Sequence, residues 1–178
     1  MDPIKIIQKY YNPESRLYET LLIHSERVRD KALECIDRRK LDVDREFVIS
    51  AAMLHDIGIF RCDAPKIFCT GSLPYIMHGI EGRKILDSEG LPAHALVCER
   101  HTGAGLTVED IERQKLPLPH RDMTPQTLEE KLICYADKFY SKSGDIREEK
   151  SLERVMRSME RHGADTLSRF MKLHEMFG

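Results

Sequence analysis

The chain has 178 residues, the size of one ordinary domain, and a formal net charge of −2, which argues against a general nucleic-acid binder because such proteins are usually basic. No stretch approaches the roughly 20 apolar residues that span a bilayer, and the N-terminus lacks the apolar segment of a secretion signal. Five cysteines, an odd number with no C-x-x-C pair, indicate free and mostly buried thiols in a reducing compartment, so we expect one cytoplasmic domain over residues 1–178.

Two helices are predicted in the first third of the chain. Asn12-Pro13 is typical of an N-cap followed by proline at the first helical position, and the apolar stripe after it predicts one long helix to about Lys40. Asp42 or Asp44 can cap a second helix, which runs through the segment FVISAAMLHD. Gly58 is well placed to end this second helix.

The middle of the chain is expected to form a loop followed by two helices. Residues 61–73 contain proline, glycine and scattered polar side chains, which favours a loop or lid. A helix is expected from about Tyr75 to Ser88. Pro92 then begins another helix, which ends near His101.

The last third of the chain is also predicted to be helical. Residues 107–110 resemble a capping box, and Thr124-Pro125 opens the helix PQTLEEKLICYADKFY after a proline-containing loop. Gly163 divides the charged tail, residues 148–177, into two helices. No segment alternates with the period of two that marks a half-buried strand. We therefore expect no sheet and an all-α fold of about seven to nine helices.

Six ionisable side chains lie in apolar segments. Two of them form an adjacent His-Asp pair, and each of the other four lies on a separate predicted helix or at a helix end. An ionised carboxylate in such a place is costly unless it is paired or bound to a cation, and neutral imidazoles donate nitrogen lone pairs to metals. This pattern predicts a site for one or two divalent ions, which iron, manganese, zinc, cobalt or nickel would suit better than magnesium. The six residues are His24, His55, Asp56, His78, His101 and Asp137.

Each of these residues also has an ordinary structural interpretation. A single histidine on an apolar helix face is more commonly a hydrogen-bonded core residue, and Asp137 alone could be a helix cap or a partner for Lys138 or Arg147. The joint pattern favours a metal site over these alternatives. The four other histidines have polar neighbours or lie in predicted loops, and they are interpreted as surface residues: His94, His120, His162 and His174.

Five segments resemble the HD superfamily of metal-dependent phosphohydrolases: LLIHSERVRDKA, AAMLHDIGIF, HGIEGRKIL, ERHTGAG and ICYADKFY. The match is to HDIG-type members, whose signature is intact at residues 55–58. The resemblance covers a motif core of about residues 20–145, leaves C-terminal helices at about 148–177, and looks closest to small, uncharacterised prokaryotic HDIG proteins. It implies an HD-domain-like helical bundle with a central metal site, and it leaves the substrate open.

The resemblance also implies roles for individual residues. A first ion would be held by His24, His55, Asp56 and Asp137, which match the family's first metal set. His78 and His101 match the additional histidines of members with a second metal, in which the aspartate that matches Asp56 bridges both ions and is the catalytic carboxylate. One position departs from many relatives, because Ile59 follows the signature where they carry a basic residue. Arg61 or Lys66 would have to supply that cation.

The leading functional hypothesis is hydrolysis of a phosphoester or phosphoanhydride bond in a small phosphorylated substrate, which we expect to be a nucleotide or a related metabolite. Two ions would lower the pKa of a shared water and neutralise charge on the phosphoryl oxygens. Arg27, Thr102 and Lys138 are candidate contacts to phosphate, because Arg27 lies one turn after His24 and the others directly follow candidate ligands. Their alternative interpretation is surface charge, or a hydroxyl bonded to nearby backbone.

Two other functions remain open from the sequence. Some members of the superfamily use a six-ligand di-iron form of this site as oxygenases, and an organophosphonate or polyol would then be the substrate. A non-catalytic, nucleotide-binding regulatory domain is the third possibility. The charged tail has Met156 and Met159, which could pack on the core or on a second copy of the chain in a homodimer.

Overall fold

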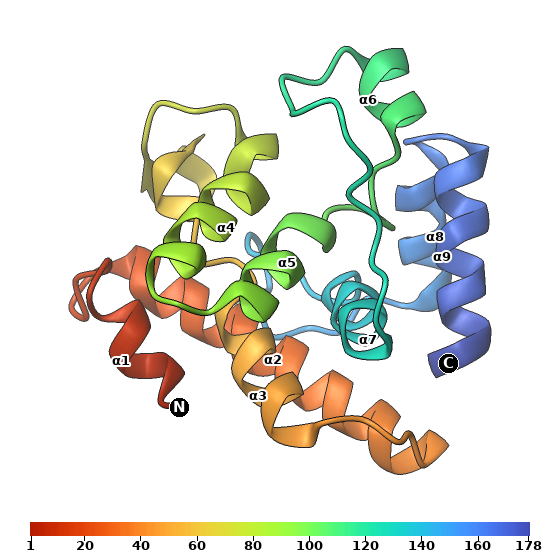
Figure 1. Ribbon diagram of the computed structural model, residues 1–178, viewed down its shortest axis with the longest axis horizontal. Helices are drawn as coiled ribbons and strands as arrows, with labels where there is room; N and C mark the ends of the chain where they lie inside the picture. Colours follow the sequence, from red (N-terminus) through yellow and green to blue (C-terminus); the bar gives the residue numbers. More distant parts are fainter.

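The longest helix, α2 (Arg16–Arg39), crosses the molecule and contacts α3 and α7 (Figure 1). The computed structural model describes residues 1–178. Helix α2 begins three residues later than predicted, because the Ser15 hydroxyl accepts the hydrogen bond from the Tyr18 N–H, whereas Asn12 accepts from the Glu14 N–H in a turn before the helix. Lys40, in the left-handed conformation, ends the helix where the sequence placed its end.

Helix α3 (Arg45–Leu54) begins at Asp44, whose carboxylate accepts a hydrogen bond from the Phe47 N–H. The helix ends before the HDIG signature, so the prediction that Gly58 ends it is wrong. Gly58 has a φ of −83°, which any residue can adopt. Glycine is required here for a different reason, because a Cβ at this position would overlap backbone atoms of His78 and Gly82 in the next helix.

The segment between α3 and α4 is more structured than the predicted loop. Strands β1 (Asp63–Ala64) and β2 (Cys69–Thr70) form an antiparallel pair, with 3₁₀ turns at Ile59–Arg61 and Pro65–Ile67. The expectation of no sheet is therefore wrong for this small hairpin. Its strands are two residues long, too short for an alternating pattern to be detected.

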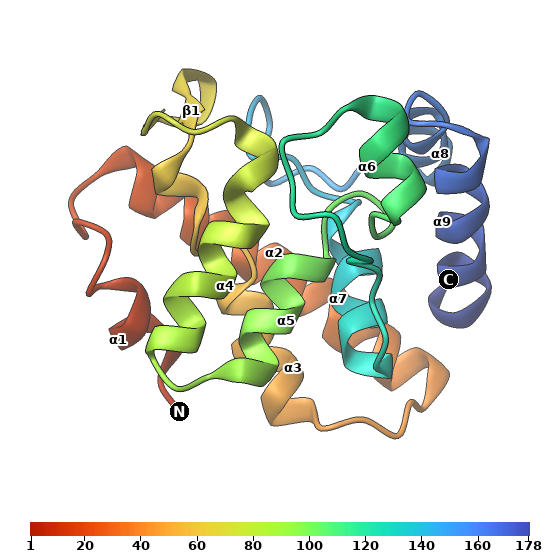
Figure 2. The ribbon, with the colours of Figure 1, turned by 45° about the horizontal axis from the view of Figure 1, so that its top comes forward.

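Helices α4 (His78–Ser88) and α5 (Pro92–Arg100) pack side by side, as both ribbon views show (Figures 1 and 2). A 3₁₀ turn at Tyr75–Met77 leads into α4. The two helices agree with the predicted ranges. They place His78 at the start of α4 and His101 just after the end of α5.

The C-terminal third confirms four predicted helices and shortens the predicted helix PQTLEEKLICYADKFY at both ends, to residues 128–137. Helix α6 (Val108–Gln114) has the expected capping box. Helix α7 (Leu128–Asp137) begins at Thr127, whose hydroxyl accepts from the Glu130 N–H, and not at Thr124-Pro125 as predicted. Helices α8 (Leu152–Glu160) and α9 (Ala164–Phe177) follow, with Gly163 between them.

A short additional helix, α1 (Pro3–Ile7), was not predicted. It lies at the opposite end of the molecule from α8 and α9 in both ribbon views (Figures 1 and 2). The all-α fold class is confirmed, with nine helices and the small hairpin. No helix has the length and apolar character that a bilayer span requires.

The hydrophobic core has two large apolar clusters and a third of three residues, and α2 contributes to both large ones. Leu21 belongs to a cluster of 14 buried residues and Val28 to a cluster of 20. His24 lies between them on the same helix face, and its exposed fraction is 0%. The predicted apolar stripe on α2 is therefore confirmed, and it runs from one cluster to the other. The candidate ligands lie near this junction.

Candidate metal centre

Five segments bring the six candidate ligands into one buried cluster. Helix α2 supplies one histidine, the segment after α3 supplies a histidine and an aspartate, and α4, the end of α5 and α7 supply one residue each. Every one of these side chains is buried. Their donor atoms fall into two groups of mutual neighbours: His24, His55, Asp56 and Asp137 in the first, and Asp56, His78 and His101 in the second.

Asp56 belongs to both groups because its two carboxylate oxygens face different histidines. Oδ2 lies 3.2 Å from Nε2 of His24 and 3.2 Å from Nε2 of His55. Oδ1 lies 3.5 Å from Nε2 of His78 and 3.3 Å from Nε2 of His101. Asp137 adds its Oδ1 to the first group, 2.9 Å from Nε2 of His24. One carboxylate thus spans two clusters of donors.

Three of the histidines are fixed by the same local hydrogen bond. In each, Nδ1 bonds to the carbonyl oxygen of the residue three positions earlier; because a carbonyl only accepts, Nδ1 carries the proton and Nε2 faces the cluster. This is the second hydrogen bond that metal-binding histidines commonly make. The pairs are His55 with Ala52 at 2.7 Å, His78 with Tyr75 at 2.7 Å and His101 with Cys98 at 2.8 Å.

The polar atoms of the cluster lack enough partners within the protein. Nε2 of His55 and Oδ1 of Asp56 are buried and form no hydrogen bond, and the only charge partner of Oδ2 of Asp56 apart from the histidines is the ammonium of Lys142. Nε2 of His78 lies 3.1 Å from Nε2 of His101, so two nitrogens that are both lone-pair donors in the neutral rings face each other. Buried polar groups without partners are costly. The donor set therefore fits divalent cations, and these buried groups could hold them.

Both carboxylates of the cluster are ionised near neutral pH, and His55 carries a compensating proton that a bound cation would displace. Burial opposes ionisation of Asp56 and Asp137, but lysines and histidines beside them hold the pKa of both carboxyls well below the usual range. Burial also opposes the charged form of His55, but the neighbouring carboxylates outweigh it and raise its pKa to about 9. Burial lowers the pKa of His78 to about 3, so this ring is neutral near pH 7.

Lys142 is a site residue that sequence reasoning missed. Its ammonium lies 2.6 Å from Oδ2 of Asp56, and the charge of Asp56 raises the pKa of Lys142 well above its usual value despite burial. The residue lies after α7 in a segment of turns and bends. No helical spacing connects it to the other candidates, so the sequence had no periodic signal for it.

The three predicted phosphate contacts occupy different places. Lys138 donates to Oδ2 of Asp137 at 2.6 Å and to the carbonyl oxygen of His101 at 3.0 Å, so it braces the cluster. Arg27 is partly buried. Its positive charge partly offsets the rise in the pKa of the Tyr140 hydroxyl, which burial raises to about 12. Thr102 is partly buried directly after His101. Contact of these three with phosphate stays a prediction.

Arg61 and Lys66 were proposed to replace the basic residue that is absent at Ile59. Of these two, Lys66 is better placed relative to the cluster of candidate ligands, because it lines two hollows that Lys142 also lines. The guanidinium of Arg61 instead lies over the ring of Phe60, 4.9 Å from its centroid.

The prediction that His94 is a surface residue is wrong. Its side chain is buried, its Nε2 lies 2.9 Å from the Ser50 hydroxyl oxygen, and its ring packs on Phe47. These contacts depend on α3 lying beside α5, which local sequence does not reveal. His174 is partly buried, with Nδ1 2.9 Å from the Tyr135 hydroxyl oxygen. His120 and His162 are exposed, as predicted.

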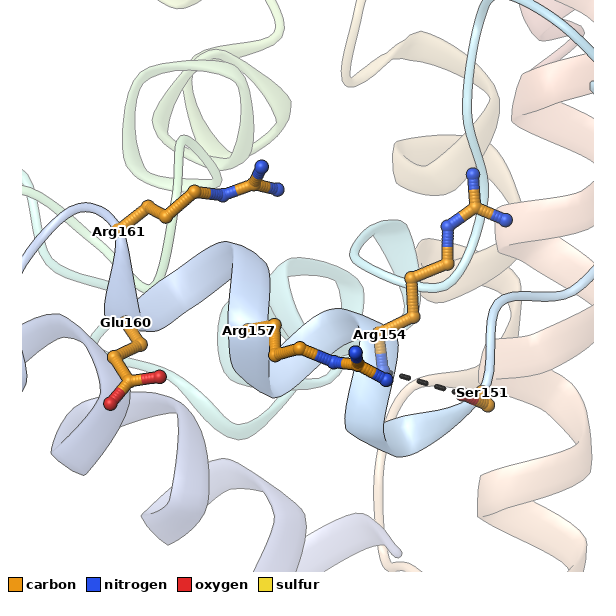
Figure 3. Close-up of a pocket in the computed structure, with 5 residues that line it drawn as sticks. All are labelled: Ser151, Arg154, Arg157, Glu160 and Arg161. Carbon is orange, nitrogen blue, oxygen red and sulfur yellow. Dashed lines mark hydrogen bonds between the residues drawn. The ribbon is translucent and has the colours of Figure 1, made fainter.

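A separate hollow of about 620 Å³ lies on α8. Figure 3 shows Arg154, Arg157 and Arg161 spread along this helix, and none of the three forms an ion pair. Ser151 and Glu160 complete the lining. No candidate metal ligand lines this hollow, so it is not part of the cluster.

Comparison with known proteins points to one family. The HD domain family model matches residues 21–142, a range that contains all six candidate ligands. An uncharacterised protein of Methanocaldococcus jannaschii is 37% identical over 123 residues, which cover 67% of this chain and 65% of that protein. No solved structure matches the chain significantly.

Two longer relatives are named tRNA (cytidine(56)-2'-O)-methyltransferase. The protein from Picrophilus torridus is 34% identical over 159 residues, which cover 88% of this chain and 41% of the relative. The one from Thermoplasma volcanium is 31% identical over 157 residues, which cover 87% of this chain and 41% of the relative. The chain therefore spans about two fifths of the length of these methyltransferases.

Proposed function

Because the chain belongs to the HD domain family, we propose that it is a metal-dependent phosphohydrolase that cleaves a phosphoester or phosphoanhydride bond in a nucleotide or a related small metabolite. The observation that carries this proposal is the position of Asp56, whose two oxygens face two separate groups of nitrogen donors. A carboxylate shared in this way suits a pair of ions, and paired ions are a common arrangement for phosphoryl chemistry.

The proposed ligand roles follow the two groups of donors. His24, His55, Asp56 and Asp137 would hold one ion, and Asp56, His78 and His101 would hold the other. Divalent ions supply Lewis acidity, which activates water and offsets the negative charge of a phosphoryl group. Iron, manganese, zinc, cobalt and nickel suit this mixed nitrogen and oxygen set better than magnesium.

The protein's own residues prepare the site for this chemistry. The carbonyl groups of Ala52, Tyr75 and Cys98 fix three imidazole rings, so little reorganisation is needed when a cation binds. Lys138 holds Asp137 through its Oδ2. Lys142 places a positive charge beside Asp56, where it can bind a phosphoryl oxygen of a substrate.

The two methyltransferase relatives do not change this proposal. The chain covers only 41% of each, and the buried cluster consists of side chains that could hold cations. We therefore do not assign methyl transfer to this segment. A role beside an RNA-modifying activity is compatible with a phosphohydrolase site, because the two activities would reside in different parts of those longer proteins.

The experiment that tests the proposal combines metal content with activity. Protein purified without chelators or a histidine tag is analysed by elemental mass spectrometry, and phosphate release is then measured anaerobically from a panel of nucleotides and sugar phosphates. We expect close to two ions per chain and phosphate release that Asp56→Asn abolishes. Absence of metal after reconstitution overturns the proposal. Oxygen uptake with an organophosphonate or polyol, without phosphate release, would instead identify an oxygenase.

A further inference from the structure

Two hollows lie next to each other at the edge of the metal cluster, with volumes of about 250 and 270 Å³. They share three lining residues, Lys66, Lys142 and Ser143. The ammonium of Lys142 reaches Oδ2 of Asp56, so these hollows adjoin the cluster itself. Together they approach the size of a pocket for a small organic ligand, which is roughly 300–1,000 Å³.

The first hollow is rich in positive charge. Arg16, Lys66 and Lys142 line it, and Glu19 is the one acidic side chain among its lining residues. Neither Arg16 nor Lys66 forms an ion pair within the protein, so their charges are available to a ligand. Clefts lined by one sign of charge concentrate ligands of the opposite sign. An anionic group is therefore expected here, next to the candidate metal ligands.

An exposed aromatic ring completes the same hollow. Phe68 is one of three exposed large hydrophobic side chains, with an exposed fraction of 39%. The guanidinium of Arg16 lies 4.3 Å from its ring centroid. The Phe68 backbone has a φ of 64°, a left-handed conformation that is uncommon and strained for a bulky residue. A strained position that displays a flat apolar surface beside unpaired cations suits a planar ligand group.

We propose that these hollows form a binding site for a nucleoside monophosphate, a proposal that rests on the function proposed above. The phosphate lies between Lys66 and Lys142, beside Asp56. The base stacks on the surface formed by Phe68 and Arg16, since aromatic rings and guanidinium planes both bind bases through stacking. The site thereby selects nucleotides over phosphorylated sugars that lack a base.

The test compares two non-hydrolysable ligands by isothermal titration of the full chain as purified. One is the phosphonate analogue of adenosine 5'-monophosphate and the other is the phosphonate analogue of ribose 5-phosphate, which has no base. Wild type is expected to bind the adenosine compound about 10-fold more tightly, a ratio typical of one base stacked on one aromatic ring. Equal affinities, or no binding of either compound, overturn the proposal.

Variants assign the selectivity to named residues. Phe68→Gly removes the ring and suits the positive φ, so the fold is retained. It is expected to lower the adenosine affinity about 10-fold and leave the ribose compound unchanged, whereas Phe68→Tyr retains selectivity. Lys66→Ala is expected to weaken the binding of both ligands. Lys172→Ala on α9 is the matched control and is expected to weaken the binding of neither. Unchanged adenosine affinity in Phe68→Gly overturns the proposal.

The same variants separate this inference from the proposed function. If wild type hydrolyses nucleotides and Asp56→Asn abolishes hydrolysis, while Phe68→Gly binds both ligands like wild type, the function stands and the binding site is rejected. If no substrate is hydrolysed but selectivity for the adenosine compound depends on Phe68, the binding site stands and the hydrolase is rejected.

Discussion

The Nε2 atoms of His78 and His101 lie 3.1 Å apart, while each ring donates its Nδ1–H to a backbone carbonyl group. Two neutral imidazoles cannot satisfy each other in this arrangement, because both present lone pairs. A shared proton or a cation resolves the conflict. Burial keeps the pKa of both rings below its usual value, which disfavours the proton and leaves a metal ion as the better partner.

The separation of donors into two groups predicts the effect of His101→Ala on metal content. Only three residues make up the second group, and the variant leaves it with two, whereas all four residues of the first group remain. We expect metal content to fall from close to two ions per chain to close to one. Elemental mass spectrometry of both proteins measures this. An unchanged ratio would contradict the assignment of His101 as a ligand.

Replacing Lys142 is expected to destabilise the metal-free protein more than the metal-loaded one. The ammonium offsets the charge of buried Asp56, and removal of one partner of a buried pair costs about 3–5 kcal/mol. Bound cations replace that missing charge. Urea unfolding of wild type and Lys142→Met, each with chelator and with manganese, measures the difference. An equal loss of stability in both states would show that Lys142 does not act through Asp56.

Gly58→Ala should be among the most damaging conservative substitutions in the chain. A Cβ at this position overlaps the backbone of His78 and Gly82, which cannot move away as a flexible side chain could. We expect a loss of stability of about 3 kcal/mol or more. Gly90→Ala is the matched control, because Gly90 has a positive φ of 74° but open space around it, and should cost only about 1 kcal/mol. Thermal and urea unfolding measure both values.

The buried cysteines predict a loss of stability at alkaline pH. Burial raises the pKa of Cys69 from 9.0 to about 12. Between these values the unfolded chain has released the thiol proton and the folded chain retains it, so stability is unaffected below about pH 9 and falls as pH rises further. The decrease per thiol is about 1.4 kcal/mol per pH unit. Urea unfolding from pH 8 to 11 should show a shallower decrease in Cys69→Ala, and equal slopes would exclude this contribution.

The buried cluster of candidate ligands was predictable because its residues follow local rules. His24 lies on the apolar face of α2 between Leu21 and Val28, and an ionisable residue there requires a partner. Helix ends were predicted less well where several polar residues compete for the cap. Ser15 caps α2 in place of Asn12, although Asn12-Pro13 has the typical pattern.

Features that depend on contacts between distant segments were missed. Lys142 reaches Asp56 from a segment without helical periodicity, and His94 is buried only because Phe47 and Ser50 of α3 lie beside it. Phe68 has an unusual backbone conformation within a hairpin of two-residue strands. In each case the position results from tertiary packing, and neither spacing nor composition encodes it locally.

The hydrogen-bonded contact between His24 and Asp137 joins residues 113 positions apart. Contacts of such long range form late, because the chain must first lose the entropy of a large loop. The cluster therefore assembles only when α2 and α7 meet, and a short peptide that carries the HDIG signature has just one histidine and one aspartate of the set. If the cluster binds metal as proposed, metal uptake would report that α2 and α7 have met, and refolding with a delayed addition of metal would follow that step directly.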